Sequence, residues 1–430
     1  MAVVFMLIYS KLSNFLSKPK LFYTMIGSFL GFFALFQFVL YPNRDVLHPT
    51  LFADALQAFL PKGLSGLVAI IRNWTFSLFY IMSELWGSVA TSLLFWGFAN
   101  DITRVSESKR FYSLFGIGAN IAMLISGPTI MYFSSIKNQL PVGVDAWGFT
   151  LNLLLSIVLV SGVLVMLIYR WMNKNVLTDA RFFDPNDISK GKKKEKPNLS
   201  LKESFKYLAK SRYVLCIATL VVAYGIAINL VEVTWKGQLK LQYPDSNDYM
   251  NFMGLFSFIT GAVTIFMMLI SGPIIRRFGW GTGALITPVV LLATGIGFFA
   301  FIIFKDSLGG FVGLMGTTPL MVAVVIGTMQ NIMTKSSKYS LFDPTKEMAY
   351  IPLDQEAKVK GKAAIDVVGA RMGKSGGSLI NASLIATFGS LSAITPYVAG
   401  VLFLIIFAWI GSARSLSKKF ETAQQTAASA

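Results

Sequence analysis

Residues 147–171 read WGFTLNLLLSIVLVSGVLVMLIYRW, an apolar run whose one charged side chain, Arg170, lies at its end. A helix needs about 20 mostly apolar residues to cross the hydrocarbon core of a bilayer. This run is long enough, and the surface of a soluble domain would not tolerate it. We therefore expect a transmembrane helix here.

The same pattern recurs along the whole chain, which has 430 residues, 54% of them hydrophobic and 14% charged. A soluble protein carries roughly 25% charged residues, so water-facing surface is scarce. An apolar stub at residues 1–10 lacks a small-residue cleavage site and is not expected to be a signal peptide. The composition predicts an all-α polytopic membrane protein with ten full spans plus this stub. The predicted spans are residues 22–41, 73–100, 111–134, 147–171, 213–235, 250–275, 280–304, 311–334, 364–387 and 391–411.

The basic residues predict the orientation in the membrane. The chain has 38 Lys and Arg against 21 Asp and Glu, a net charge of +17 that in a soluble protein would suggest a nucleic-acid partner. Here 29 of the basic residues fall in one set of alternate loops, which includes residues 335–362, and 7 fall in the other set. Lys and Arg collect on the cytoplasmic side. We therefore expect a cytoplasmic C-terminus and no nucleic-acid partner.

Reactive side chains are scarce, with one cysteine, Cys216, and one histidine, His48. This excludes an intrachain disulfide and a His-rich metal site, and it disfavours a Ser-His-Asp triad. We expect neither an enzyme nor a bound metal or cofactor.

One long hydrophilic interruption divides the chain. Residues 173–212 contain KGKKKEKP at 190–197, which predicts a solvated cytoplasmic linker, with specific binding of anionic lipid as the alternative. We expect an N-terminal bundle at 1–172, the linker at 173–212, a C-terminal bundle at 213–412 and a cytoplasmic tail at 413–430.

The two halves resemble each other weakly, as transporter repeats do. DITRVSESKRFYSLFG from Asp101 matches the spacing of DQEAKVKGKAAIDVVG from Asp354, and each leads into the fifth span of its half. The basic turn SGPIIRRFGWG at 271–281 occupies the place that residues 10–20 hold in the first half. This register predicts two six-helix bundles similar to the major facilitator architecture, with the first helix and part of the second missing before residue 1.

Charged residues within spans are expected to face a cavity, because a charge at mid-bilayer costs several kcal/mol (about 2.5–3.5 on the lenient scale). Glu84 lies near the middle of the span 73–100. The polar residues on its helical face are Asn73, Ser77, Tyr80, Ser88 and Thr91. This stripe indicates a substrate-facing side, with a structural hydrogen bond between helices as the alternative.

A second group lies at the end of the span 213–235, where Asn229 and Glu232 share a face with Lys236. Glu232 is a candidate site residue and Lys236 an outer one. The spacing of four residues also allows an ion pair within the helix, so this alternative stays open.

A third group, Arg371, Lys374, Ser378 and Asn381, lines one face of the Gly- and Ala-rich span 364–387. Two cations inside a span favour a polyanionic cargo, and phosphate fits Arg as a fork and Lys as a point charge. Snorkelling of both side chains to the interface is the alternative. The run GARMGKS at 369–375 is one residue short of the GxxxxGK[ST] phosphate loop and lacks a preceding strand, so we do not expect ATP hydrolysis.

In the span 111–134, Gly116, Gly118 and Gly127 predict close helix packing. Asn120, which lies among them, is a candidate cavity donor.

Four stretches resemble one known family. Two are long, FWGFANDITRVSESKRFYSLFGIGANIAMLISG at 95–127 and EMAYIPLDQEAKVKGKAAIDVVGARMGKSGGSLI at 347–380, and two are short, YIMSELWGS at 80–88 and INLVEVTWKGQL at 228–239. On these residues the chain is similar to the ATP:ADP antiporters, the nucleotide transporters of plastids and obligate intracellular bacteria. The family's intramembrane charges match Glu84, Glu232 and Lys374, whereas its first helix, with a functionally important lysine, has no counterpart in this chain.

The resemblance implies a carrier that exchanges ATP for ADP, plus phosphate, by alternating access across a bacterial inner membrane, and we expect a monomer in the lipid bilayer. The alternative within this class is a proton-coupled importer of a broader range of ribonucleotides, with Glu84 or Glu232 carrying the proton. A polytopic enzyme would place acidic or His clusters at the membrane face, and a receptor or scaffold would not need intramembrane cations. The candidate substrate-binding residues are Lys374, Arg371, Glu84, Glu232, Lys236, Asn120, Asn381, Tyr80 and Asn229.

Overall fold

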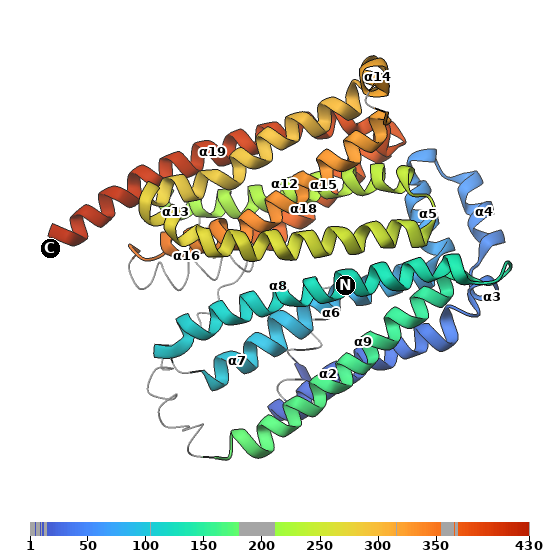
Figure 1. Ribbon diagram of the computed structural model, residues 1–430, viewed down its shortest axis with the longest axis horizontal. Helices are drawn as coiled ribbons and strands as arrows, with labels where there is room; N and C mark the ends of the chain where they lie inside the picture. The colour runs from blue at the N-terminus through green and yellow to red at the C-terminus, as the bar shows by residue number, and fades with distance from the viewer. Residues whose placement is uncertain are drawn as a thin grey trace. The chain divides into compact units, whose positions relative to one another are not determined.

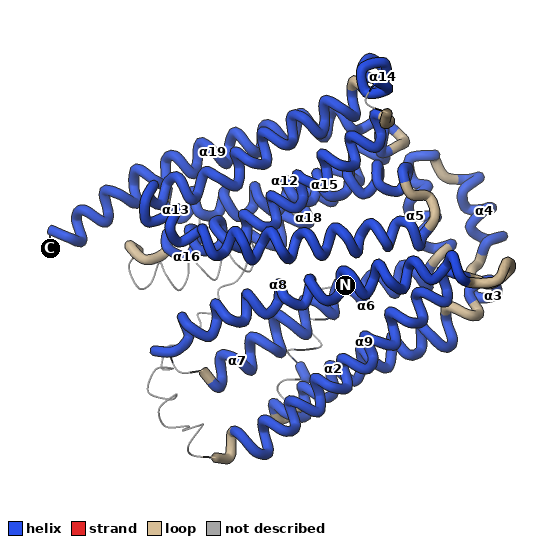
Figure 2. Tube along the Cα trace, in the orientation of Figure 1, coloured by secondary structure: helices blue, strands red, loops and turns tan. Residues whose placement is uncertain are grey.

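The computed structural model describes residues 5, 9, 11–12, 15–103, 105–179, 211–314, 316–353, 365 and 369–429. The regular elements in these residues are all helices, and the described residues contain no strand (Figure 1). Figure 2 shows helices filling nearly all of the described trace. Among the described residues, seven helices are long and apolar enough to cross a membrane, or eight if one sharply bent pair forms a single span. The predicted class, an all-helical polytopic membrane protein, is confirmed.

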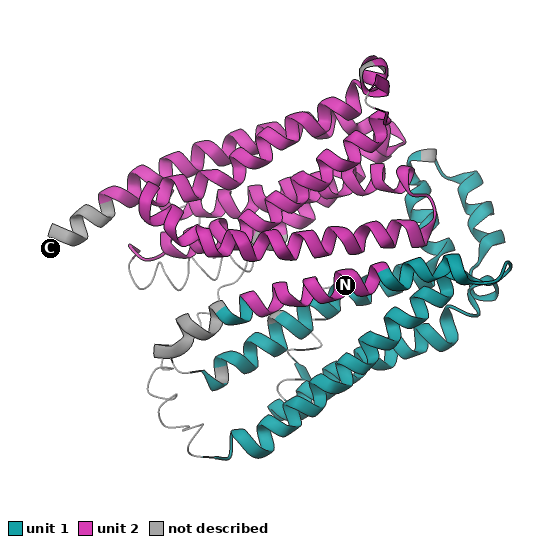
Figure 3. Ribbon diagram, viewed as in Figure 1, with its two compact units in different colours: residues 1–116, 132–194 teal, residues 117–131, 195–430 magenta. Residues whose placement is uncertain are grey.

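The chain divides into two compact units (Figure 3). Unit 1 comprises residues 1–116 and 132–194, and unit 2 comprises residues 117–131 and 195–430. The middle of one long helix, α8, therefore groups with unit 2 while its ends group with unit 1. The boundaries expected from the sequence at 172 and 212 stay predictions, because residues 180–210 lie outside the described residues.

Unit 1 is held together by apolar packing between its first and last long helices. The ring of Phe22 stacks on that of Tyr169 at 3.8 Å, and the side chain of Leu30 fills the space beside Gly162. The elements are α2 (Lys18–Leu35), η1 (Phe36–Leu40), α3 (Arg44–Leu47), α4 (Thr50–Phe59), η2 (Lys62–Leu64), α5 (Ser65–Arg72), α6 (Trp74–Trp86), η3 (Gly87–Phe95), α7 (Trp96–Ile102), α8 (Val105–Ser135), η4 (Ile136–Gln139), α9 (Ala146–Trp171) and η5 (Met172–Val176).

Unit 2 is built around α12, which packs against α15, α18 and α19. Trp235, Leu230 and Leu239 of α12 are fully buried there, as is Trp409 of α19. The elements are α12 (Arg212–Gln242), α13 (Ser246–Ile303), α14 (Lys305–Leu314), α15 (Pro319–Ser337), η6 (Lys338–Phe342), α16 (Asp343–Ala349), α18 (Ala370–Phe388) and α19 (Leu391–Ser429).

The spans predicted at 250–275 and 280–304 belong to one element, α13, which is interrupted at Gly279. Gly279 has φ 84° and ψ 169°, a backbone conformation that glycine adopts easily and other residues do not. The basic turn predicted from SGPIIRRFGWG contains this glycine. Figure 1 shows the two segments of α13 running in opposite directions.

The span predicted at 311–334 is wrong at its start, because the chain bends by 85° between Ser307–Leu314 and Pro319–Ala349. Gly316 has φ 71°, and the Thr318 hydroxyl accepts a hydrogen bond from the Met321 N–H. Pro319 then occupies the first turn, where its missing N–H costs nothing. A new helix therefore begins at Pro319 and continues past Thr334 to include Lys335.

Two further predictions fall wholly or partly on residues outside those described. Most of the stub at residues 1–10 lies outside them, as do residues 364 and 366–368 of the span 364–387. The part of that span that is described is α18, which is 19 residues long. The ten spans counted from sequence exceed the eight found because α13 counts once and α18 is not among them, and the count is seven if the bent pair is left out.

Candidate functional site

A carboxylate on α12 of unit 2 is shared by two lysines. Glu232 Oε1 is 3.0 Å from Lys236 Nζ and 3.5 Å from Lys335 Nζ. The first ion pair is the one that the spacing of four residues left open as an alternative. The second joins α12 to α15 and was not predicted, because Lys335 was assigned to a cytoplasmic loop.

Lys335 is the lysine beside Glu232 that sequence reasoning missed. Its side chain is only 26% exposed, and its Nζ lies 5.1 Å from the ring centroid of Phe256 on α13. The positive charges of Lys236 and Lys374 both act on it. The signal was present in the run Gly316 to Pro319, because a helix that begins at Pro319 needs about 20 residues to cross a bilayer and therefore includes Lys335.

Lys374 is positioned by a backbone contact between α12 and α18. A Cβ atom on Gly225 would lie 2.8 Å from the Cα of Gly373, so only glycines permit this approach. One turn further along, Gly377 packs against the side chain of Asn229, whose Nδ2 donates to the Ser378 hydroxyl at 3.3 Å. The predicted polar faces of the two helices therefore meet.

These side chains carry more positive than negative charge. We use the term lysine cluster for Glu232, Lys236, Lys335 and Lys374, in which three ammonium groups accompany one carboxylate. Lys374 is exposed and forms no ion pair among the residues that the structure describes. The side chain of Arg371 lies outside the described residues. The lysine cluster can therefore bind an anion that carries at least two negative charges.

Asn381 does not share the open face predicted for it. The residue is 4% exposed, and neither its Oδ1 nor its Nδ2 has a hydrogen-bond partner among the described residues. α18 packs against both α12 and α19, which leaves Lys374 and Ser378 exposed and covers Asn381. The role of Asn381 in substrate binding stays a prediction.

Asn120 is likewise buried, with 7% of its surface exposed. It belongs to residues 117–131, the part of α8 that groups with unit 2. A Cβ on Gly261 would lie 2.9 Å from the Asn120 carbonyl oxygen, and one on Gly127 would lie 2.7 Å from the Gly254 carbonyl oxygen. The close packing predicted from Gly127 is confirmed, whereas the space around Gly118 is open. The backbone of Asn120 takes part in this helix contact, and its role as a cavity donor stays a prediction.

Glu84 and Tyr80 lie on α6 of unit 1, and both are exposed. Ser88, four residues beyond Glu84, donates its hydroxyl hydrogen to the Glu84 carbonyl oxygen at 3.3 Å. The stripe is shorter than predicted, because Asn73 precedes α6 and a π-helix, η3, begins at residue 87. A π-helix does not repeat every 3.6 residues, so positions beyond Ser88 do not follow the predicted face.

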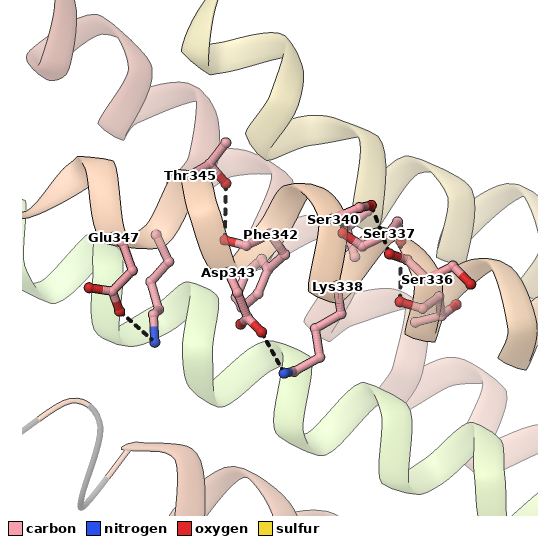
Figure 4. A network of polar contacts seen from close by, with 11 residues as sticks. Ser336, Ser337, Lys338, Ser340, Phe342, Asp343, Thr345 and Glu347 are labelled. Atoms are coloured by element: carbon pink, nitrogen blue, oxygen red, sulfur yellow. Dashed lines mark hydrogen bonds and ion pairs between the residues drawn. The ribbon is translucent and has the colours of Figure 1, made fainter. Parts of the chain in front are cut away.

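A second polar network lies next to the lysine cluster along α15, η6 and α16 (Figure 4). Lys338 Nζ is 2.7 Å from Asp343 Oδ2 and 4.1 Å from the ring centroid of Tyr339. Figure 4 shows the ammonium and the carboxylate pointing toward each other. This is a closed pair of one cation and one anion, unlike the lysine cluster.

Two kinds of chemistry find no support in the described residues. They contain no group of three or more His, Cys, Asp or Glu side chains that could hold a metal ion. The GARMGKS run continues as helix from Ala370 onward, so this part of it is not a phosphate-binding loop.

The fold and the lysine cluster together define a multi-pass helical membrane protein with an excess of positive charge inside its helices. A family model described as TLC ATP/ADP transporter matches residues 1–420, and the chain belongs to this family. The family is one of nucleotide transporters, which makes the chain a carrier and not an enzyme.

Three relatives show how widely this sequence is shared. ADP,ATP carrier protein 1 of Chlamydia pneumoniae is 61% identical over 420 residues, which cover 97% of this chain and 82% of that protein. The plastidic ATP/ADP-transporter of Solanum tuberosum is 55% identical over 425 residues, which cover 99% of this chain and 66% of that protein. ADP,ATP carrier protein 1 of Rickettsia bellii is 45% identical over 423 residues, which cover 98% of this chain and 84% of that protein.

Proposed function

We propose that this chain exchanges ATP for ADP across the bacterial inner membrane by alternating access, with phosphate accompanying ADP. The observation that carries the proposal is the lysine cluster, in which Lys236, Lys335 and Lys374 share one carboxylate. Nucleoside di- and triphosphates carry several negative charges on adjacent phosphate groups. These charges would complement the excess of ammonium groups in the lysine cluster. The names of the relatives, which are ADP,ATP carriers, support the same substrates.

The proposed roles follow from charge and exposure. Lys374 and Arg371 hold phosphates, because an ammonium acts as a point charge and a guanidinium as a fork. Lys236, with 45% of its side chain exposed, is an outer phosphate contact. Glu232 balances the cations when no substrate is bound.

The remaining candidates divide by exposure. Glu84 and Tyr80, both exposed, together with Asn229, are proposed to contact ribose and base. Asn120 and Asn381 are buried and are proposed to support the helices that carry the site.

We further propose ten spans in two major facilitator-like bundles, a monomeric state and a cytoplasmic C-terminus. The halves related by the repeat and the 29 to 7 division of basic residues between alternate loops support this arrangement. Protease accessibility of a C-terminal tag in right-side-out and inverted vesicles tests the orientation.

Exchange follows from the cost of moving uncompensated charge. When the site is empty, its ammonium groups carry an excess of positive charge, which must move through a medium of low dielectric constant as the carrier reorients. The negative charges of bound phosphates remove that excess. The empty carrier should therefore reorient more slowly than the loaded one. Uptake of labelled ATP into ADP-loaded liposomes should greatly exceed uptake into nucleotide-free liposomes, and equal rates would refute obligate exchange.

The alternative, proton-coupled import of several ribonucleotides, requires a carboxylate that gains and loses a proton. Glu232 is poorly suited, because protonation would break its ion pairs with Lys236 and Lys335. Glu84 is exposed and forms no ion pair among the described residues, so it is the better candidate. Uptake that depends on a pH gradient and is inhibited by GTP, CTP and UTP would favour this alternative.

A further inference from the structure

We infer that Lys335 is a phosphate-binding residue of the nucleotide site and that the Glu232 carboxylate occupies its ammonium until a substrate phosphate replaces it. The inference rests on the proposed function and adds a residue that the sequence pattern placed in a loop. Lys335 would thereby couple the arrival of substrate to the release of an ion pair between α12 and α15.

The geometry shows an ion pair that is shared and therefore incomplete. Lys236 and Lys335 approach the same oxygen of Glu232, at 3.0 Å and 3.5 Å. Lys236 already provides the carboxylate with a close partner within its own helix. The Lys335 ammonium is the more distant of the two from this oxygen, and the positive charge of Lys374 repels it as well. Among the described residues one carboxylate accompanies these three ammonium groups, so an anionic ligand would relieve repulsion among them.

The burial of Lys335 explains why an anion must replace Glu232 when that pair opens. Its side chain is 26% exposed and its Nζ lies over the ring of Phe256. A cation in such a place is costly without a counter-ion. A phosphate oxygen, like a carboxylate oxygen, is an anionic acceptor of charge-assisted hydrogen bonds. Substrate and Glu232 therefore compete for one ammonium group.

A purely structural ion pair would look different, and the neighbouring network provides the comparison. Lys338 and Asp343 lie 2.7 Å apart as one cation with one carboxylate. That pair is complete without a ligand. Lys338 is also a lysine of the same helical run, which makes Lys338→Gln a matched control for Lys335→Gln.

The test measures the affinity of the purified protein for ATP, ADP and AMP. A lost charged hydrogen bond corresponds to roughly a ten- to hundredfold loss of affinity. We expect Lys335→Gln to weaken ATP binding by about this factor and AMP binding by much less, because AMP has one phosphate. Lys335→Arg should stay within a few-fold of the wild type, and Lys338→Gln should not change the affinity.

Glu232→Gln provides the opposite prediction. Removing the competing carboxylate should tighten ATP binding about two- to fivefold, the scale of a partly exposed ion pair. Most of this gain should vanish in the double variant with Lys335→Gln. The measurement on the single variant Glu232→Gln does not depend on whether Lys335→Gln folds.

The inference is overturned if Lys335→Gln folds and binds ATP normally, or if it weakens the binding of ATP and AMP equally. It is also overturned if Lys338→Gln weakens ATP binding as much as Lys335→Gln does, or if Glu232→Gln binds ATP less tightly than the wild type. A wild-type protein that binds no nucleotide would instead refute the proposed function. The two failures are therefore distinguishable.

Discussion

Gly225 and Gly373 touch backbone to backbone. A Cβ on Gly225 would lie 2.8 Å from the Gly373 Cα, and a Cβ on Gly373 would lie 2.9 Å from the Gly225 Cα. The contact brings α12 and α18 closer than side chains would permit. Because Lys374 follows Gly373 directly, the same contact sets the distance between this lysine and the carboxylate of α12.

Gly225→Ala is expected to lower the free energy of unfolding by about 1–3 kcal/mol, since the added methyl group forces the helices apart. Thermal unfolding in detergent measures it. Gly400→Ala in α19 is the control, because nothing lies within 4 Å of its Cβ position. Alanine there should be neutral or stabilising by up to about 1 kcal/mol. Equal unfolding temperatures for the two variants would contradict the close contact.

Lys374→Glu is expected to abolish nucleotide binding, because it places a negative charge where the phosphates should lie. Binding of labelled ATP to the purified protein is the measurement. Lys418→Glu reverses the charge of an exposed lysine on α19 and should leave the affinity unchanged. If Lys374→Glu binds ATP as tightly as the wild type, the assignment of the phosphate site is wrong.

Asp145→Ala is expected to destabilise unit 1 by about 1–2 kcal/mol, the usual cost of losing a helix cap. Asp145 accepts the Gly148 N–H at the start of α9 and also binds Arg44 and the Tyr41 hydroxyl. Asp54→Ala removes only a pair with Arg72 in which Asp54 is 62% exposed, so it should cost no more than about 1 kcal/mol. Thermal unfolding compares the two, and a larger loss from Asp54→Ala would refute the capping role.

Gly279→Ala is expected to cost about 1–2 kcal/mol, because φ at this residue is 84° and an L-residue is strained there. Gly272→Ala in the same helix is the control, since its Cβ position is open and its φ is not in that region. Differential scanning calorimetry of both variants provides the measurement. An unchanged melting temperature for Gly279→Ala would mean that the turn tolerates another conformation.

The sequence predicted the parts of this protein that depend on local demands. A bilayer requires apolar runs of a given length wherever a helix crosses it, so most spans and the turn at SGPIIRRFGWG could be found one at a time. The ion pair between Glu232 and Lys236 was likewise foreseeable as an alternative, because four residues separate neighbours on any helix. The missed start at Pro319 was also local, since Gly316 and Pro319 carry the signals for a break.

The sequence by itself thus determined a helical membrane carrier with charges inside its spans, together with the family to which the chain belongs. Only the tertiary structure decided that Lys335 reaches Glu232 and that Asn381 is covered while Lys374 stays exposed. The reason is physical. Partners on α12, α15 and α18 are set by how closely those helices approach, and no periodicity within one helix encodes that distance. For α12 and α18 it depends on the contact between Gly225 and Gly373.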